Sequence, residues 1–195
     1  SHDLRTPLTR MKLQISFLKD KKAKSELEID INEMTAMLDS YVSFVKTESP
    51  ETIEDININE LIKECIKSID KSNYDINIFE KNLIKTSGRP IQLKRAFQNI
   101  IDNSKRYGDK IHIYIHLNDV DCIVEINDNG MGIPKDKYED VFKPFFTLDP
   151  SRNKLKGESG LGLTITRDII RSHGGEIKLD KSKLGGLKLT VILPL

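Results

Sequence analysis

The chain has 195 residues, of which 37% are hydrophobic and 31% are charged, and its formal net charge is +1 at pH 7. A chain of this length can bury a core, and its balanced charge excludes functions that need a strongly basic or acidic molecule, such as nonspecific nucleic-acid binding. No apolar run approaches the roughly 18 residues of a membrane-spanning helix, so we expect a soluble globular chain.

The first part of the chain is predicted to form a helical hairpin. Apolar residues recur with alternating spacings of four and three through 4–18 and again through 27–45, which is typical of one apolar stripe on each helix. The second helix is predicted to begin near Glu26, because Ser25 and Glu28 have the spacing of a capping box. Two such hairpins can bury their stripes in a four-helix bundle, and packing on the rest of the same chain is the alternative.

The first helix opens with the motif SHDLRTPLT. At 100° per residue, His2 and Thr6 share a face that points away from the apolar stripe. Asp3 can hold the imidazole so that one ring nitrogen keeps a proton and the other presents a lone pair, and Pro7 removes a backbone donor from the same turn. A lone histidine on a polar face is usually only solvated, but this combination suits a nucleophilic imidazole.

A polar segment at 49–58 is predicted to be a linker, and an α/β domain is expected from 59 to 195. Its first helix has Asn59 as a possible cap. A later helix begins at Arg89-Pro90 and places Asn99 and Asn103 on one face, four residues apart. These asparagines could simply be surface residues, but carboxamide oxygens are also hard ligands that suit Mg²⁺.

Two strands are predicted at 110–117 and 122–128, and the second runs into DNGMGIP. The carboxylate of Asp128 can accept a hydrogen bond from an exocyclic amine, which suits adenine and rejects guanine. Gly130 and Gly132 would let a planar base lie against bare backbone.

A long basic loop separates this motif from the next helix. Gly157, Gly160 and Gly162 precede a strongly helical run, and glycine amides at a helix N-terminus form an anion site suited to a triphosphate. The loop composition is that of a lid over a nucleotide. Arg152 is the candidate for the γ-phosphate, with Lys154 and Lys156 as weaker candidates or as an ordinary solvated charge run.

Other reactive side chains have plainer interpretations. Cys65 and Cys122 lie in apolar runs without metal-ligand spacing, which indicates reduced core residues and a cytosolic compartment. His112 and His116 share a strand face, but no third ligand with suitable spacing follows, so a polar strand face is preferred over a metal site.

The motifs together resemble a known family. SHDLRTPLT is similar to the H-box of bacterial sensor histidine kinases, and IQLKRAFQNIIDNSKRYG resembles their N-box. DNGMGIP, FKPFF and GESGLGLTITRDII resemble the G1, F and G2 boxes of the GHKL ATP-binding fold, and with the ending GGLKLTVILPL the resemblance is closest to EnvZ-type osmosensor kinases.

This resemblance implies a helical-hairpin dimerisation domain at 1–48, forming a four-helix bundle as a homodimer, and an α/β two-layer sandwich ATP-binding domain at 59–195. It implies ATP and Mg²⁺ as cofactors, with Asn103 as the metal ligand, Arg106 near the phosphates and Tyr107 against the adenine. Ser104 departs from the usual alanine, and Arg106 from the common lysine. The implied nucleotide-binding residues are Asn99, Asn103, Arg106, Tyr107, Asp128, Gly130, Gly132, Ile133, Phe145, Arg152, Gly160, Leu161, Gly162 and Leu163.

The implied activity is ATP-dependent autophosphorylation of His2, with Asp3 orienting the ring, followed by transfer to an aspartate of an OmpR-like response regulator. Thr6 would position water for dephosphorylating that regulator. Because the chain starts without Met and already in a helical pattern, we expect the cytoplasmic portion of a bacterial inner-membrane protein. The alternatives are a GHKL-type ATPase clamp and a non-catalytic module for dimerisation and regulator docking.

Overall fold

The computed structural model describes residues 2–46, 51–67, 69, 73–148 and 160–195. The chain divides into two compact units: Ser1–Ser49 with Lys143–Leu161, and Pro50–Phe142 with Gly162–Leu195. Within the described part of the chain, no helix is both long enough and apolar enough to cross a membrane.

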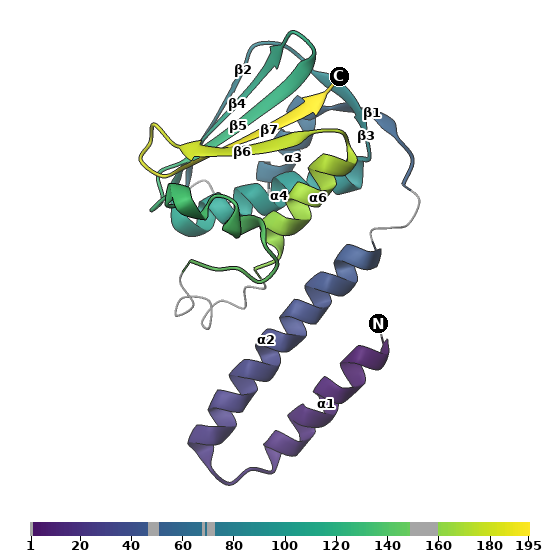
Figure 1. Ribbon diagram of the computed structural model, residues 1–195, viewed down its shortest axis with the longest axis vertical. Coiled ribbons are helices and arrows are strands. Elements are labelled where there is room, and N and C mark those ends of the chain that lie inside the picture. The colour runs from purple at the N-terminus through teal and green to yellow at the C-terminus, as the bar shows by residue number, and fades with distance from the viewer. Residues whose placement is uncertain (1, 47–50, 68, 70–72, 149–159) are drawn as a thin grey trace. The chain divides into compact units, whose positions relative to one another are not determined.

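The first unit contains the predicted helical hairpin (Figure 1). Its helices are α1 (His2–Ser16), which continues through Pro7, and α2 (Lys21–Lys46). Among the hairpin side chains that the structure describes, the buried apolar ones are Leu8, Ile15 and Ile31. Many more are exposed: Met11, Leu13, Phe17, Leu18, Leu27, Ile29 and Met34. The apolar stripes predicted from the sequence are therefore only partly covered by the hairpin itself.

The start of α2 differs from the prediction. Asp20 Oδ1 accepts hydrogen bonds from the backbone N–H groups of Lys22, at 2.9 Å, and Ala23, at 3.3 Å. This carboxylate caps a helix that begins five residues before the predicted start near Glu26, so the predicted capping box of Ser25 and Glu28 is wrong.

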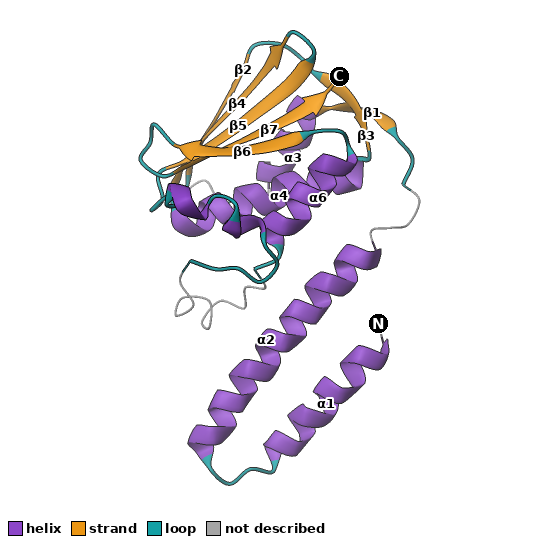
Figure 2. Cartoon of the chain, viewed as in Figure 1, coloured by secondary structure: helices purple, strands orange, loops and turns teal. Residues whose placement is uncertain are grey.

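The second unit is a two-layer α/β sandwich in which helices cover one face of a sheet (Figure 2). The sheet contains, in spatial order, β2 (Asp75–Glu80), β4 (Lys110–Asn118), β5 (Asp121–Asp128), β7 (Leu187–Pro194) and β6 (Glu176–Lys181). Strand β2 is parallel to β4, and all other neighbouring pairs are antiparallel. The helices are α3 (Ile58–Lys67), α4 (Pro90–Tyr107) and α6 (Gly162–Ser172).

The core lies between the sheet and these helices. Alternate residues of β4 and β5 are buried on the helix side, and on α4 Phe97, Ile100 and Ile101 are at most 1% exposed. The periodicity of two in the strands and of 3.6 in α4 places these side chains in one layer, as predicted. Cys65 and Cys122 are fully buried in this unit, and burial raises their thiol pKa values to about 11 and about 12.

A second, smaller sheet lies within the predicted linker and beyond it. Strand β1 (Glu54–Asn57) pairs antiparallel with β3 (Lys85–Gly88). The residues of β1 were predicted to be linker, because a four-residue polar strand carries no periodic signal of its own. Its partner supplies the hydrogen bonds that make it a strand.

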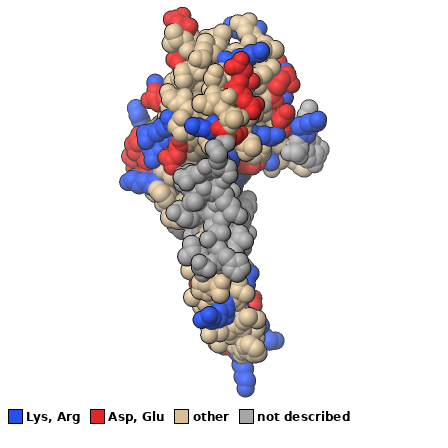
Figure 3. All heavy atoms as spheres, turned by 90° about the vertical axis from the view of Figure 1, so that its right-hand side faces the viewer, with Lys and Arg blue, Asp and Glu red and all other residues tan. Residues whose placement is uncertain are grey.

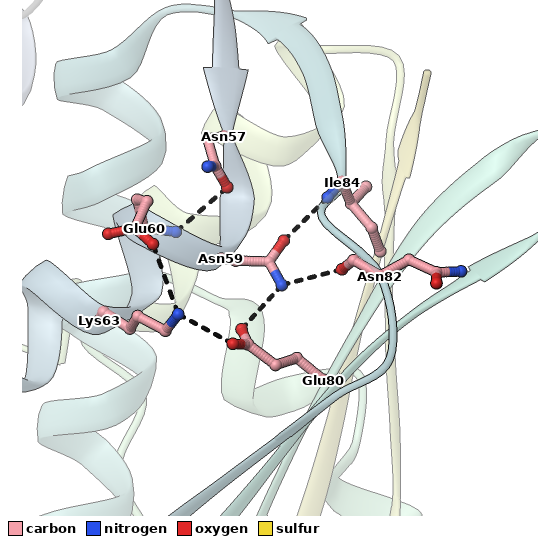
Figure 4. A network of polar contacts seen from close by, with 7 residues as sticks. All are labelled: Asn57, Asn59, Glu60, Lys63, Glu80, Asn82 and Ile84. Carbon is pink, nitrogen blue, oxygen red and sulfur yellow. Dashed lines mark hydrogen bonds and ion pairs between the residues drawn. The ribbon is translucent and has the colours of Figure 1, made fainter.

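Asn59 does not cap α3. Its side chain is 4% exposed and lies between α3 and the chain that links β2 to β3 (Figure 4). Its Oδ1 accepts from Ile84 N–H at 2.9 Å, and its Nδ2 donates to Glu80 at 2.8 Å and to the Asn82 carbonyl at 3.0 Å. The capping role belongs to Asn57, which accepts from Glu60 N–H at 3.3 Å.

Two short 3₁₀ helices follow β5, η1 (Lys135–Lys137) and η2 (Asp140–Phe142). The first half of the predicted lid loop is therefore helical in part. On the face shown in Figure 3, basic and acidic side chains are interspersed over the α/β unit, in keeping with the small net charge.

Candidate active site

A buried carboxylate at the end of β5 forms the centre of the candidate site. Asp128 is 3% exposed, and its Oδ1 accepts hydrogen bonds from Gly130 N–H at 2.9 Å and Leu187 N–H at 3.0 Å. Its backbone carbonyl accepts from Gly186 N–H at 3.1 Å. The turn after β5 and the start of β7 therefore hold this side chain in one position.

Opposing effects set the ionisation of this carboxyl group. Burial raises the pKa of Asp128 above its ordinary value, whereas hydrogen bonds from Leu187 N–H, Gly130 N–H and the Ser104 hydroxyl lower it. A carboxylate that is removed from water and already held by protein hydrogen bonds is well suited to accept a further hydrogen bond from a ligand.

Two glycines allow the backbone to approach this carboxylate. A Cβ on Gly186 would overlap Asp128 Oδ1 and Gly130 N, and a Cβ on Gly130 would lie 2.9 Å from Tyr107 Cβ. Gly132 has φ of +70°, in the left-handed region that favours glycine. The predicted Gly130 thus lies at the carboxylate, and Gly186 joins it from the turn between β6 and β7. A Cβ on Gly132 would lie 3.4 Å from the Gly186 carbonyl oxygen, so Gly132 packs against that turn.

Helix α4 supplies the next group of residues. Asn99 and Asn103 lie one turn apart and are half-buried, and Asn99 Nδ2 donates to the Gly162 carbonyl at 3.3 Å. Ser104, which is 4% exposed, links this helix to Asp128. The structure therefore brings the predicted asparagines, Asp128 and Gly162 into one region of the α/β unit.

Gly162 and Leu163 form the first turn of α6. A Cβ on Gly162 would meet no atom of the chain within 4 Å, so the space beside this helix N-terminus is open. The Gly162 carbonyl is held by Asn99 and, at 2.8 Å, by the Thr166 hydroxyl. The first amides of α6 can therefore face an anion while its first carbonyl is fixed from α4.

Phe142, the last residue of η2, is held by contacts with α6. The Phe142 carbonyl accepts from the Thr164 hydroxyl at 3.0 Å and from Arg167 Nη2 at 3.2 Å. The Arg167 guanidinium also lies 4.8 Å from the centre of the Phe142 ring. Phe142 is thus fixed to α6 at the point where the chain leaves the α/β unit.

Three further predicted residues belong to the other unit. Phe145 N–H donates to the Gly160 carbonyl at 3.1 Å, and both residues have positive φ, +64° and +61°. Leu161 is buried. Arg152, Lys154, Lys156 and Gly157 lie outside the described residues.

The remaining predicted residues are more exposed. Arg106 and Tyr107 end α4, and Tyr107 is 39% exposed, while Ile133 is half-buried after the glycine turn. His2 and Asp3 lie in the first turn of α1, and Thr6 is exposed one turn later on the same helix.

Three residues at the carboxylate were not predicted as site residues. They are Ser104, Gly186 and Leu187, and the last two are 58 and 59 residues from Asp128 in sequence. The pair Gly185-Gly186 before the last strand was the available sequence signal, because adjacent glycines mark a tight turn or a close backbone approach.

The arrangement has the chemistry of a site for a purine nucleotide. The Asp128 carboxylate provides an acceptor for an exocyclic amine, and the glycine backbone provides room for a flat base. The α6 N-terminus favours the phosphates. The carboxamides of Asn99 and Asn103 fit the hard oxygen ligands of Mg²⁺, which takes few ligands from protein and the rest from phosphate and water.

Comparison with protein families supports this reading of the α/β unit. Residues 88–195 match the model described as "Histidine kinase-, DNA gyrase B-, and HSP90-like ATPase". The matched range includes Asn99, Asn103, Asp128 and Gly162, and it covers more than half of the chain.

Curated relatives extend the similarity to the hairpin. The sensor histidine kinase GtrS of Pseudomonas aeruginosa is 30% identical over all of this chain and 40% of its own length. The sensor histidine kinase CpxA of Escherichia coli is 29% identical over all of this chain and 45% of its own length. The chain therefore spans less than half of the length of these relatives.

A solved structure shares the fold of the α/β unit. The catalytic domain of histidine kinase ThkA is 27% identical, with a TM-score of 0.64, over 73% of this chain and 95% of the solved one.

Proposed function

Because this chain belongs to the histidine kinase-, DNA gyrase B- and HSP90-like ATPase family, we propose that it is the ATP-dependent core of a two-component sensor histidine kinase. The observation that carries the proposal is the Asp128 carboxylate, held by Gly130, Leu187 and Ser104 beside the asparagines of α4. The relatives that match the whole chain, hairpin included, are themselves sensor histidine kinases.

In this proposal the α/β unit binds ATP. Asp128 accepts the adenine amine, Tyr107 lies against the base, and the amides at the start of α6 bind phosphate oxygens. Mg²⁺ would be held by Asn103, with Asn99 beside it, and would neutralise phosphate charge. Arg106 and Arg152 are the proposed cationic residues near the phosphates.

The hairpin supplies the phosphoacceptor. An imidazole nitrogen of His2 forms a bond to the γ-phosphorus as the bond to the ADP oxygen breaks, and Asp3 keeps the attacking nitrogen unprotonated by holding the proton on the other one. The enzyme contributes mainly by positioning and by stabilising charge. The proposed phosphoacceptor domain is 1–48, and the proposed ATP-binding domain is 59–195.

We propose a homodimer in which two hairpins form a four-helix bundle. The support is the exposed apolar surface of α1 and α2, where Met11, Leu27 and Met34 are each at least 42% exposed in the single chain. Packing two amphipathic hairpins against each other removes such surface from water.

The next step in the proposal passes the phosphoryl group to an aspartate of a response regulator, OmpR-like if the EnvZ-type resemblance extends to the partner. Thr6 is exposed on α1 and is proposed to orient water for the reverse task, hydrolysis of the phosphoaspartate. Signal-sensing parts would belong to the rest of a longer, membrane-anchored protein, since the relatives are more than twice as long.

The test is self-labelling with γ-labelled ATP. The label should survive base and be lost in acid, as a phosphoramidate does, and His2→Gln should remove it while nucleotide affinity stays within a few-fold. ATP hydrolysis without covalent label would favour an ATPase clamp, and absence of nucleotide binding would favour a non-catalytic docking module. Label that persists in His2→Gln would contradict the assignment of His2.

The phosphatase role of Thr6 has its own test. Thr6→Ala should leave self-labelling largely intact and slow the loss of phosphate from the regulator, so that phosphorylated regulator accumulates. Equal loss of both rates, with a lower melting temperature, would indicate that Thr6 only supports the helix.

A further inference from the structure

Helix α4 is capped by a side chain from far upstream in the sequence. Glu51 Oε1 accepts a hydrogen bond from Ile91 N–H at 2.5 Å, and Oε2 accepts from Gln92 N–H at 3.3 Å. The residue at the N-cap position, Arg89, makes no side-chain capping bond. Ile91 and Gln92 carry the amides that an N-cap side chain ordinarily satisfies, so Glu51 replaces the missing cap.

The position of Glu51 in the chain makes this contact more than a local cap. Residues 47–50 connect Lys46, the last residue of α2, to Glu51, and the next paired residue is Glu54 of β1. The helix that Glu51 caps is the one that carries Asn99 and Asn103. Glu51 therefore attaches the chain arriving from the hairpin directly to the helix of the candidate site.

We propose that Glu51 is a positioning residue for self-phosphorylation, which holds the connection from α2 at the N-terminus of α4 and keeps that connection short. The inference rests on the proposed function. Without the Glu51 contact, the connection lengthens from four residues (47–50) to seven (47–53) before Glu54. Effective concentration falls roughly as the −3/2 power of connecting length, so the encounter of His2 with the bound nucleotide should slow about two- to threefold.

The experiment compares the complete chain with Glu51→Ala. We expect the self-labelling rate at saturating ATP to fall about two- to threefold while nucleotide affinity stays within about 1.5-fold. Hydrogen exchange of the Ile91 and Gln92 amides should accelerate, since they lose their acceptors. Glu51→Gln keeps one acceptor oxygen, so its labelling rate should lie between those of the unmodified chain and Glu51→Ala.

A second variant separates positioning from helix stability. Glu51→Ala with Arg89→Ser places a hydroxyl at the N-cap and should recover amide protection and melting temperature, but not the labelling rate. Glu54→Gln, the control for loss of one negative charge nearby, should label like the unmodified chain.

Several outcomes overturn the inference. Recovery of the rate in the double variant would show that Glu51 only stabilises α4, and an unchanged or raised rate in Glu51→Ala would show no positioning effect. Unchanged exchange at Ile91 and Gln92 would show that the contact is absent in solution. Absence of labelling in the unmodified chain would overturn the proposed function, and this inference with it.

Discussion

The helical hairpin and the α/β unit bury their apolar side chains to different extents. In the α/β unit, the side chains of Ile111, Ile113 and Ile170 are fully buried, and the helices and sheet cover one another. In the hairpin, Met34 is 50% exposed and Leu13 is 60% exposed, although both helices are amphipathic. One unit therefore completes its own core, while the other presents a surface that association would complete.

This difference assigns separate physical roles to the two regions. A closed core can hold a buried carboxylate such as Asp128 in a fixed position, which recognition of a ligand requires. An incomplete helical surface is suited to a partner, because burying it contributes free energy to association. Substitutions in the α/β unit should then leave self-association unchanged, and substitutions in the hairpin should leave nucleotide affinity unchanged.

The largest effect on the α/β side is expected from Asp128→Asn. The substitution removes the charge and replaces one acceptor oxygen with an N–H donor, and a charged hydrogen bond contributes about 1.5–3 kcal/mol. Nucleotide affinity measured by calorimetry should fall about 10- to 100-fold, with self-association unchanged. Asp121→Asn, at the other end of β5, is the matched control and should bind normally. Equal affinity in both variants would place the base elsewhere.

Gly186→Ala tests whether the turn before β7 belongs to the same site. The added methyl group would overlap Asp128 Oδ1 and Gly130 N, so the backbone must shift. Overpacking of this kind costs about 1–3 kcal/mol, and we expect nucleotide affinity to fall about tenfold together with a lower melting temperature. Lys183→Ala, in the same turn, should change neither measurement. Normal affinity in Gly186→Ala would separate the turn from nucleotide recognition.

On the hairpin side, Met34→Lys should weaken self-association about tenfold, because a charge replaces apolar surface that the dimer is proposed to bury. Analytical ultracentrifugation measures the effect, and nucleotide affinity is expected to stay unchanged. Asn32→Lys adds the same charge at an exposed polar position of α2 and serves as the control. Identical dimer affinity in both variants would mean that the apolar surface of α2 is not the interface.

The smallest effect concerns pH. In the proposed site the adenine amine donates to ionised Asp128, so nucleotide affinity should decline as pH falls through the pKa of this group, which burial raises above the ordinary value. The Ser104 hydroxyl lowers that pKa, so Ser104→Ala should move the decline to higher pH. The affinity of Ser104→Ala should drop more steeply than that of the unmodified chain on acidification and should change little at alkaline pH, and Ser172→Ala is the control. A uniform loss at both pH values would indicate a packing effect instead.

Sequence patterns predicted the elements with strong local periodicity. The 3.6-residue period identified α4 and put Asn99 and Asn103 on one face, and the alternation in β4 and β5 placed Asp128 at a strand end. Glycines at 130 and 132 marked the turn after it. The predicted start of α2 was wrong because two candidate caps, Asp20 and Ser25, lie only five residues apart, and the local sequence does not rank them.

Other features depend on partners distant in sequence. Strand β1 forms because Glu54–Asn57 pairs with Lys85–Gly88. The buried carboxamide of Asn59 is satisfied by partners that include the Ile84 N–H. Neither the residues of β1 nor Asn59 lie in a sequence pattern strong enough to predict these partners. The same holds for Glu51, whose acceptor role depends on amides 40 residues away.

The sequence by itself determined the elements with strong periodicity, the motif residues and the apolar stripes, since backbone periodicity and glycine conformations are local properties. Tertiary structure decided how the Asp128 carboxylate is held. Leu187 and Gly186 reach it from the last hairpin and Ser104 reaches it from α4, because the packing of β5 between β4 and β7 under that helix brings these groups together. Burial and hydrogen bonding at Asp128 follow from that packing, and no local pattern encodes them.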